Sequence, residues 1–146
     1  MSKSVSLTDN ILDRIKPYFK APAAHRIFIL YGSARSGKTK IVREIAHKLN
    51  GVCIDLLEDK LQFLSPKLGL YSPVDFKKGI GLWAKEANPL IIIDEIEALL
   101  DTWNQEERKN FLKLVSKWRT DSVVLIVTRL DDDYESIFGK DRVFRI

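Results

Sequence analysis

Five short apolar runs divide the sequence and predict β-strands. They cover residues 26–31, 52–56, 90–94, 123–128 and 143–146. The middle three are continuously apolar, a pattern typical of strands that are buried on both faces of a parallel sheet. Covered faces of this kind require helices on both sides, so the strands predict an α/β protein of three layers.

Stripes of apolar residues with helical spacing lie between these strands. One comprises Ile41, Val42, Ile45, Ala46 and Leu49; a second comprises Val74, Ile80, Trp83 and Ala84; a third comprises Phe111, Leu112, Val115 and Trp118. Ser72 and Pro73 are the cap and first residue expected of the second helix. A further helix over residues 7–19, with Pro17 near its end, is expected before the first strand. Residues 58–71 read as a loop. The chain is therefore expected to be one domain over 1–146, with a helix and lead-in at 1–25 and the core at 26–146.

The stretch GSARSGKT, residues 32–39, follows the first strand and opens the first stripe. Its spacing matches the phosphate-binding loop, in which glycines let backbone N–H groups turn inward toward anionic oxygens. The next helix adds unpaired donors at its N-terminus. Lys38 is expected to reach the β- and γ-phosphates, and Thr39 to give its hydroxyl to Mg²⁺. The expected nucleotide contacts are Gly32, Ser33, Ala34, Arg35, Ser36, Gly37, Lys38, Thr39 and Lys40. The alternative is a chance match in a basic turn.

Arg35 occupies a position where many such loops have glycine. The backbone there prefers a left-handed conformation, which arginine adopts less easily. Its side chain is either solvated or a donor to a phosphate or partner.

Two carboxylates follow the third strand, in the stretch LIIIDEIE. In doubly wound sheets ligands bind at the carboxyl ends of the strands, the edge from which the glycine loop also emerges. Asp94 is expected to bind Mg²⁺ through its hydration shell, and Glu95 to polarise an attacking water. The alternative is that these acids cap the next helix. Thr128 ends the fourth strand, where it either senses the γ-phosphate or closes the strand.

Composition and charge exclude several other classes. The apolar fraction of 45% and charged fraction of 30% are typical of globular proteins, and no apolar run approaches membrane-spanning length. The start is polar and lacks a secretory signal, and the single cysteine, Cys53, reads as a small buried residue in a reducing cytosol, so a cytoplasmic protein is expected. Residues 1–50 hold 10 Lys and Arg against 3 Asp and Glu, which suits an anionic partner.

The order of these parts resembles the additional-strand division of P-loop ATPases, close to the AAA+ group. The resemblance covers residues 26–146 and implies a parallel sheet of order 5-1-4-3-2, with Thr128 as a sensor. It also implies an arginine finger before the last strand, for which Arg142 is the candidate and Lys140 a weaker one; the alternative is a plain surface arginine. The sequence stops just after the fifth strand, so the helical lid of AAA+ proteins is expected to be absent. Size, spacing and ending most resemble the BrxF family of small P-loop proteins in BREX phage-defence systems.

Two features are candidates for partner surfaces. Lys109, Lys113 and Lys117 form a basic stripe, which is either a DNA contact or an ordinary solvated face. Trp103 is either an interaction anchor or half-buried.

These observations predict a protein that uses ATP and Mg²⁺, a weak ATPase stimulated by self-assembly or a larger partner. The resemblance to the BrxF family implies that it is part of a bacterial phage-defence complex. The alternative is a nucleotide-dependent switch that recruits DNA or a partner with little hydrolysis. A small-molecule kinase would need an acceptor pocket and a lid, and neither is visible in the sequence.

Overall fold

The five predicted strands form one parallel sheet in the computed structural model, which describes residues 7–19, 26–33, 37–55, 90–96, 100–101, 103–117 and 123–146. The strands are β1 (Ile27–Tyr31), β2 (Val52–Asp55), β3 (Leu90–Asp94), β4 (Val123–Thr128) and β5 (Val143–Arg145). Their order is β2-β3-β4-β1-β5, and every pair is parallel. Read from the other edge, this is the order 5-1-4-3-2, so the predicted topology is confirmed.

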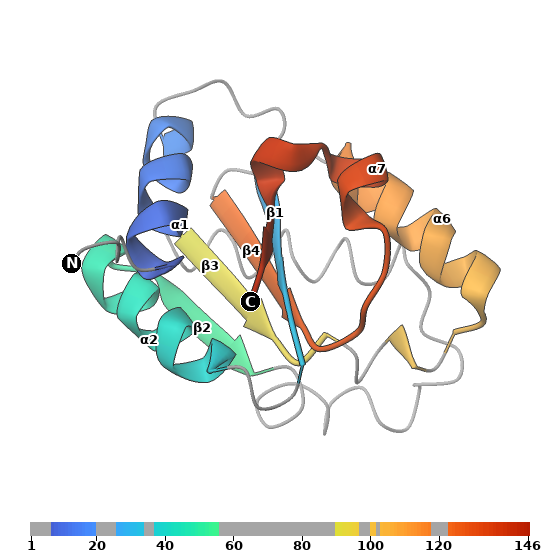
Figure 1. Ribbon diagram of the computed structural model, residues 1–146, viewed down its shortest axis with the longest axis horizontal. Coiled ribbons are helices and arrows are strands. Elements are labelled where there is room, and N and C mark those ends of the chain that lie inside the picture. Colours follow the sequence, from blue (N-terminus) through green and yellow to red (C-terminus); the bar gives the residue numbers. More distant parts are fainter. Residues whose placement is uncertain are drawn as a thin grey trace.

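Helices cover both faces of the sheet (Figure 1). One face carries α1 (Leu7–Ile15), which continues into the 3₁₀ turn η1 (Lys16–Phe19), and α2 (Lys38–Leu49). The other carries α6 (Gln105–Ser116) and α7 (Tyr134–Phe138), and the short turn η4 (Lys140–Arg142) leads into β5. The predicted three layers are thus present.

Alternate residues of β1 point into two separate cores. Ile27 and Ile29 belong to the core under α6 and α7, whereas Phe28 and Leu30 belong to the core under α1 and α2. All four are fully buried, as are nearly all residues of β3 and β4. The continuous apolar runs of these strands follow from this burial on two faces.

The strand β2 departs from the prediction because it lies at an edge of the described sheet. Val52 and Cys53 are exposed, whereas Ile54 is buried in the core. The expectation of a buried Cys53 is therefore wrong: among the described strands β2 pairs with β3 alone, and its apolar run does not imply cover on both faces.

Helix ends follow local chemistry. The α-helical part of the first segment ends at Ile15, and Pro17 lies in the 3₁₀ turn that follows it. The helix α6 begins with a capping box in which Asn104 and Glu107 each accept the other's backbone N–H. The stripe predicted at residues 72–84, the loop predicted at 58–71 and Trp118 lie outside the described residues.

Trp103 is part of the core, with only 6% of its surface exposed. Its ring lies 5.0 Å from that of Phe111 on α6, between centroids. Both alternatives drawn from the sequence, an interaction anchor or a half-buried residue, are therefore wrong. Within the part of the chain that the structure describes, no helix is both long enough and apolar enough to cross a membrane.

Candidate functional site

The carboxyl ends of β1, β4 and β3 lie side by side and bring the two sequence motifs together. The register pairs Tyr31 with Thr128 at the ends of β1 and β4. Just beyond, the N–H of Gly32 donates to the carbonyl of Thr128 at 3.2 Å, and the N–H of Ile96 donates to the carbonyl of Val127 at 3.3 Å. The segment after β1 and the segment after β3 are thus both bonded to the end of β4, so the glycine loop and the acids share one sheet edge.

Gly37 ends the loop in a conformation that favours glycine. Its φ is +89°, in the left-handed region, and it occupies the position before the first residue of α2. A Cβ added there would meet nothing within 4 Å, so the requirement for glycine comes from the backbone angle and not from crowding. Gly32, Ser33, Gly37 and the start of α2 are described; Ala34, Arg35 and Ser36 lie outside the described residues.

Lys38 folds back over the start of the loop. Its ammonium donates to the carbonyl of Gly32 at 2.8 Å and to the carbonyl of Ser33. The first turn of α2 has no side-chain cap, so its N–H groups are not occupied by a capping side chain. An ammonium beside an uncapped helix start is a chemical fit for the phosphates of a nucleotide. Thr39 and Lys40 lie exposed in this first turn.

The backbone at Glu95 is strained. Its φ is +60°, in the left-handed region that residues other than glycine seldom occupy. The Glu95 N–H donates to Oδ1 of Asp94 at 2.8 Å, and both residues are half-buried. Such strain costs on the order of 1–3 kcal/mol and is concentrated at functional sites. The bond from Ile96 to Val127 holds the chain on the far side of Glu95, so the acid is fixed between two anchored residues.

Thr128 is buried at the end of β4, with 1% of its surface exposed. Its hydroxyl oxygen accepts the N–H of Leu130 at 3.1 Å. This bond fixes the turn that follows the strand, so the side chain has a local structural contact at the position where a sensor is predicted.

Arg142 lies in η4 and is held within its own chain. Its Nε donates to the carbonyl of Phe138 at 2.9 Å, and its Nη1 donates to the carbonyl of Ser116 at 3.2 Å. Burial lowers the pKa of the Arg142 guanidinium below its ordinary value, and the Tyr18 side chain opposes this shift. Lys140, the weaker candidate, is exposed. In this conformation the arginine predicted as a finger joins the ends of α6 and α7.

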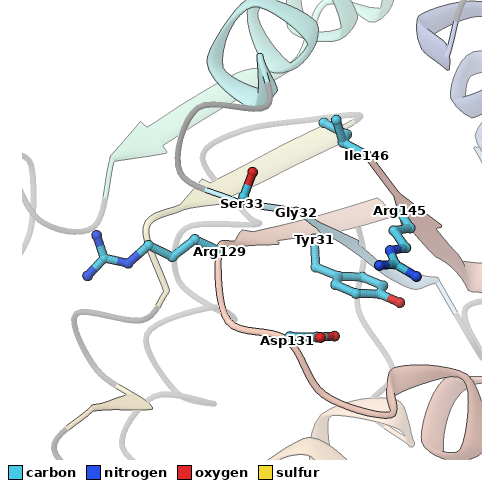
Figure 2. Close-up of a pocket in the computed structure, with 7 residues that line it drawn as sticks. All are labelled: Tyr31, Gly32, Ser33, Arg129, Asp131, Arg145 and Ile146. Atoms are coloured by element: carbon cyan, nitrogen blue, oxygen red, sulfur yellow. The ribbon is translucent and has the colours of Figure 1, made fainter.

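A cavity of about 290 Å³ opens beside the start of the glycine loop. Figure 2 shows the residues around it, which are Tyr31, Gly32, Ser33, Arg129, Asp131, Arg145 and Ile146. The sequence did not point to Tyr31, Asp131 or Arg145. The register of β1 and β5 brings Tyr31 and Arg145 together. In the sequence, the feature that could have pointed to them is that each apolar strand ends in a polar residue.

No group of three or more His, Cys, Asp or Glu side chains within the described residues is placed to hold a metal ion. Magnesium needs no such cage, because it keeps several waters and takes one or two protein oxygens together with phosphate oxygens. The Thr39 hydroxyl and the Asp94 carboxylate, on the two motifs at this edge, are oxygen donors of the required kind.

A parallel sheet of this order, with a glycine loop after β1 and paired acids after β3, defines a P-loop nucleotide-binding protein. The chain belongs to the AAA family, described as the ATPase family associated with various cellular activities, whose sequence model matches residues 28–143. A solved structure of C. elegans PCH-2 has the same fold, with a TM-score of 0.55 and 16% sequence identity. The similarity covers 96% of this chain and 41% of the PCH-2 chain. No curated protein matches the chain.

Proposed function

We propose that this chain binds Mg·ATP and hydrolyses it slowly alone, and that self-assembly or a larger protein partner stimulates the hydrolysis. The observation that supports this most strongly is the meeting of the two motifs on β4, through Gly32 to Thr128 and Ile96 to Val127. A phosphate at the loop would then face the acids that follow β3. Family membership supports the reaction class, and the geometry supports the roles proposed below.

Binding rests on the glycine loop and the start of α2. Lys38 already lies against the loop, and its ammonium would exchange the carbonyls of Gly32 and Ser33 for phosphate oxygens. The uncapped N–H groups of α2 would take further oxygens. Thr39 and Asp94 would hold Mg²⁺, which, when bound, neutralises charge that develops on the phosphates.

Hydrolysis rests on Glu95. Its constrained backbone would hold the carboxylate at the sheet edge, where it accepts a proton from the attacking water. Thr128 would contact the γ-phosphate or that water by reorienting its hydroxyl. Asp94 would assist Glu95 through the bond from the Glu95 N–H to Asp94 Oδ1.

Stimulation rests on Arg142 reaching the site of a neighbouring molecule. That role requires the guanidinium to leave the carbonyls of Phe138 and Ser116. The same contacts favour the second candidate function, a nucleotide-dependent switch with little hydrolysis, because a sequestered arginine completes no site. Measuring the size of the protein with ATP, with ADP and without nucleotide distinguishes the two functions. Assembly induced by ATP would support the arginine finger, because a finger must reach a neighbouring molecule.

Phosphate release by Glu95→Gln tests the proposal directly. We expect turnover to fall by at least about 100-fold while Mg·ATP affinity stays within about threefold, because general-base catalysis contributes 10²–10⁴-fold. Glu135→Gln, the same change at an exposed position on α7, is the matched control. Retained turnover in Glu95→Gln would remove Glu95 from the base role. Binding without phosphate release in the wild type, with DNA or without it, would favour the switch.

Calorimetry tests nucleotide binding itself. The intact protein should take up Mg·ATP, and Lys38→Ala should weaken that uptake by at least about tenfold, since it removes a charge-assisted contact to phosphate. If the folded protein binds neither Mg·ATP nor Mg·GTP, and Lys38→Ala changes nothing, the proposed function is wrong.

We also propose a cellular role in bacterial phage defence, as a cytoplasmic component of a BREX-like complex close to DNA. The support is the resemblance in motif spacing to the BrxF family. The exposed Lys109, Lys113 and Lys117 on α6 are the surface that DNA would contact. Replacing all three with glutamine should weaken DNA binding and flatten its salt dependence. Phage plating on host cells with Lys38→Ala would contradict the role if resistance were unchanged.

A further inference from the structure

The cavity beside the glycine loop has two hydrogen-bond donors on one wall. The register pairs Tyr31 on β1 with Arg145 on β5, so their side chains leave the same face of adjacent strands, which lie about 4.8 Å apart. Figure 2 shows the phenol ring and the guanidinium next to each other, whereas Arg129 extends to the opposite side. The cavity therefore offers a planar cation and a hydroxyl side by side.

Neither donor is engaged within the part of the chain that the structure describes. Arg145 is exposed and makes no ion pair there, although the acids Asp131, Asp132 and Asp133 follow β4 on the same edge. The hydroxyl of Tyr31 makes no hydrogen bond there, while its ring packs against Tyr134 at 4.9 Å. A rigid, half-buried phenol beside an unpaired guanidinium is prepared for an acceptor from outside.

The walls of the cavity are fixed by backbone bonds. The N–H of Ile146 donates to the carbonyl of Tyr31 at 2.9 Å, and the N–H of Gly32 donates to the carbonyl of Thr128 at 3.2 Å. The Tyr134 hydroxyl donates to the carbonyl of Leu130 at 2.8 Å. These bonds hold the backbone around the cavity in place and so fix the positions of the two side-chain donors.

The lining also selects the charge and size of the occupant. Asp131 lies on the same cavity, below the Tyr31 ring in Figure 2, and repels a group that carries two negative charges more than a group that carries one. A volume of about 290 Å³ lies just under the range of roughly 300–1,000 Å³ that is usual for small-molecule sites. A single carboxylate on a short side chain satisfies both conditions.

We propose that this cavity binds the carboxylate of an acidic side chain of a partner protein, through the guanidinium of Arg145 and the hydroxyl of Tyr31. The site is separate from the nucleotide phosphates, which the other part of the loop and α2 would hold. It shares Gly32 and Ser33 with that loop, so an occupant contacts the residues whose carbonyls hold Lys38.

Titration by NMR tests the site in the absence of nucleotide, so its outcome is independent of the proposed ATPase function. The probes are the peptide acetyl-Ala-Glu-Ala-amide, the same peptide with glutamine, and inorganic phosphate, all at constant ionic strength. We expect the glutamate peptide to give saturable shifts of the Arg145 side-chain N–H and the Ser33 amide. The glutamine peptide should give none. Phosphate can also bind the glycine loop, so it is followed at the Arg145 side-chain N–H, where it should bind more weakly than the glutamate peptide.

Two variants assign the donors. Arg145→Gln should weaken binding of the glutamate peptide about tenfold, the effect of losing one charge-assisted hydrogen bond. Tyr31→Phe keeps the ring and its packing on Tyr134 and should weaken binding about threefold. Arg43→Gln, the same change as the first at an exposed position on α2, should leave binding unchanged.

Three results would overturn the proposal. They are an absence of saturable shifts, equal binding of the glutamate and glutamine peptides, and tighter binding of phosphate than of the carboxylate at the Arg145 side chain. Full affinity in a folded Arg145→Gln variant would equally exclude the assigned donor.

Discussion

Replacing Arg142 with methionine should destabilise the fold, whatever the arginine does in an assembly. The guanidinium bonds two carbonyls, of Phe138 and Ser116, that lie at the ends of α7 and α6. The last carbonyls of a helix have no partner inside it, so these bonds satisfy orphan acceptors. The guanidinium also lies over the Phe138 ring, 5.6 Å from its centroid. Methionine keeps most of the apolar stem and removes all three contacts.

The magnitude follows from these contacts. Each hydrogen bond contributes about 1 kcal/mol net, and a partly exposed cation–π contact about 0.5 kcal/mol. The free energy of unfolding should therefore fall by about 2.5 kcal/mol, and Tm by roughly 8 °C for a chain of this length. Lysine at this position should recover less than half of the loss, because a single ammonium does not reproduce a planar fork that reaches two carbonyls.

Urea denaturation followed by circular dichroism measures the effect. Arg43→Met, at an exposed position on α2, is the control and should change stability by less than about 0.5 kcal/mol. A similarly small change in Arg142→Met would refute the view that Arg142 joins α6 to α7. If Arg142→Met is destabilised while ATP-induced assembly and turnover per folded molecule stay normal, the arginine has a structural role alone.

Further substitutions test the backbone and the core. Gly37→Ala and Gly139→Ala should each lower the free energy of unfolding by at least about 1 kcal/mol. Both glycines have positive φ, and a Cβ would meet no neighbouring atom, so the cost comes from the backbone angle. Only Gly37→Ala should also weaken Mg·ATP binding in calorimetry. Glu95→Gly should be about 1 kcal/mol more stable than Glu95→Ala in urea, because glycine relieves the left-handed strain; equal stabilities would refute that strain. Trp103→Ala should lose about 3–5 kcal/mol in the same assay, and a loss below 1 kcal/mol would contradict its burial.

The strands were predictable because apolar runs report burial directly, whereas their order followed from the resemblance to the additional-strand P-loop ATPases. The runs at β3 and β4 are continuous, and both strands lie between two other strands and two layers of helices. The same reasoning failed at β2, whose short run looks alike but which, among the strands that the structure describes, pairs with β3 alone. Local sequence does not distinguish an edge strand from a central one when the decisive factor is which strand lies beside it. Cys53 was misplaced for this reason.

Trp103 was misjudged for a different reason. Its neighbours in the sequence, Asp101 and Asn104, are polar and exposed, so no apolar periodicity surrounds it. Its ring packs against Phe111, which lies in the helix α6 that begins just after it. The capping box of Asn104 fixes the turn between the two residues. A single aromatic residue in a polar turn therefore needs its tertiary partner to be known before its burial can be inferred.

The candidate site also contains features that local sequence predicts and features that depend on tertiary contacts. The loop and the acids were predictable because each motif has its own sequence pattern and follows a recognisable strand. The contacts of Arg142 and the pairing of Tyr31 with Arg145 were not, because they depend on register between segments far apart in the chain. The arginine with the best motif position, Arg142, is bonded inside the chain, whereas Arg145, three residues later and without a motif, is exposed beside the loop. Motif position thus located the sheet edge at which the glycine loop and the acids meet, and strand register decides which cations are exposed at that edge.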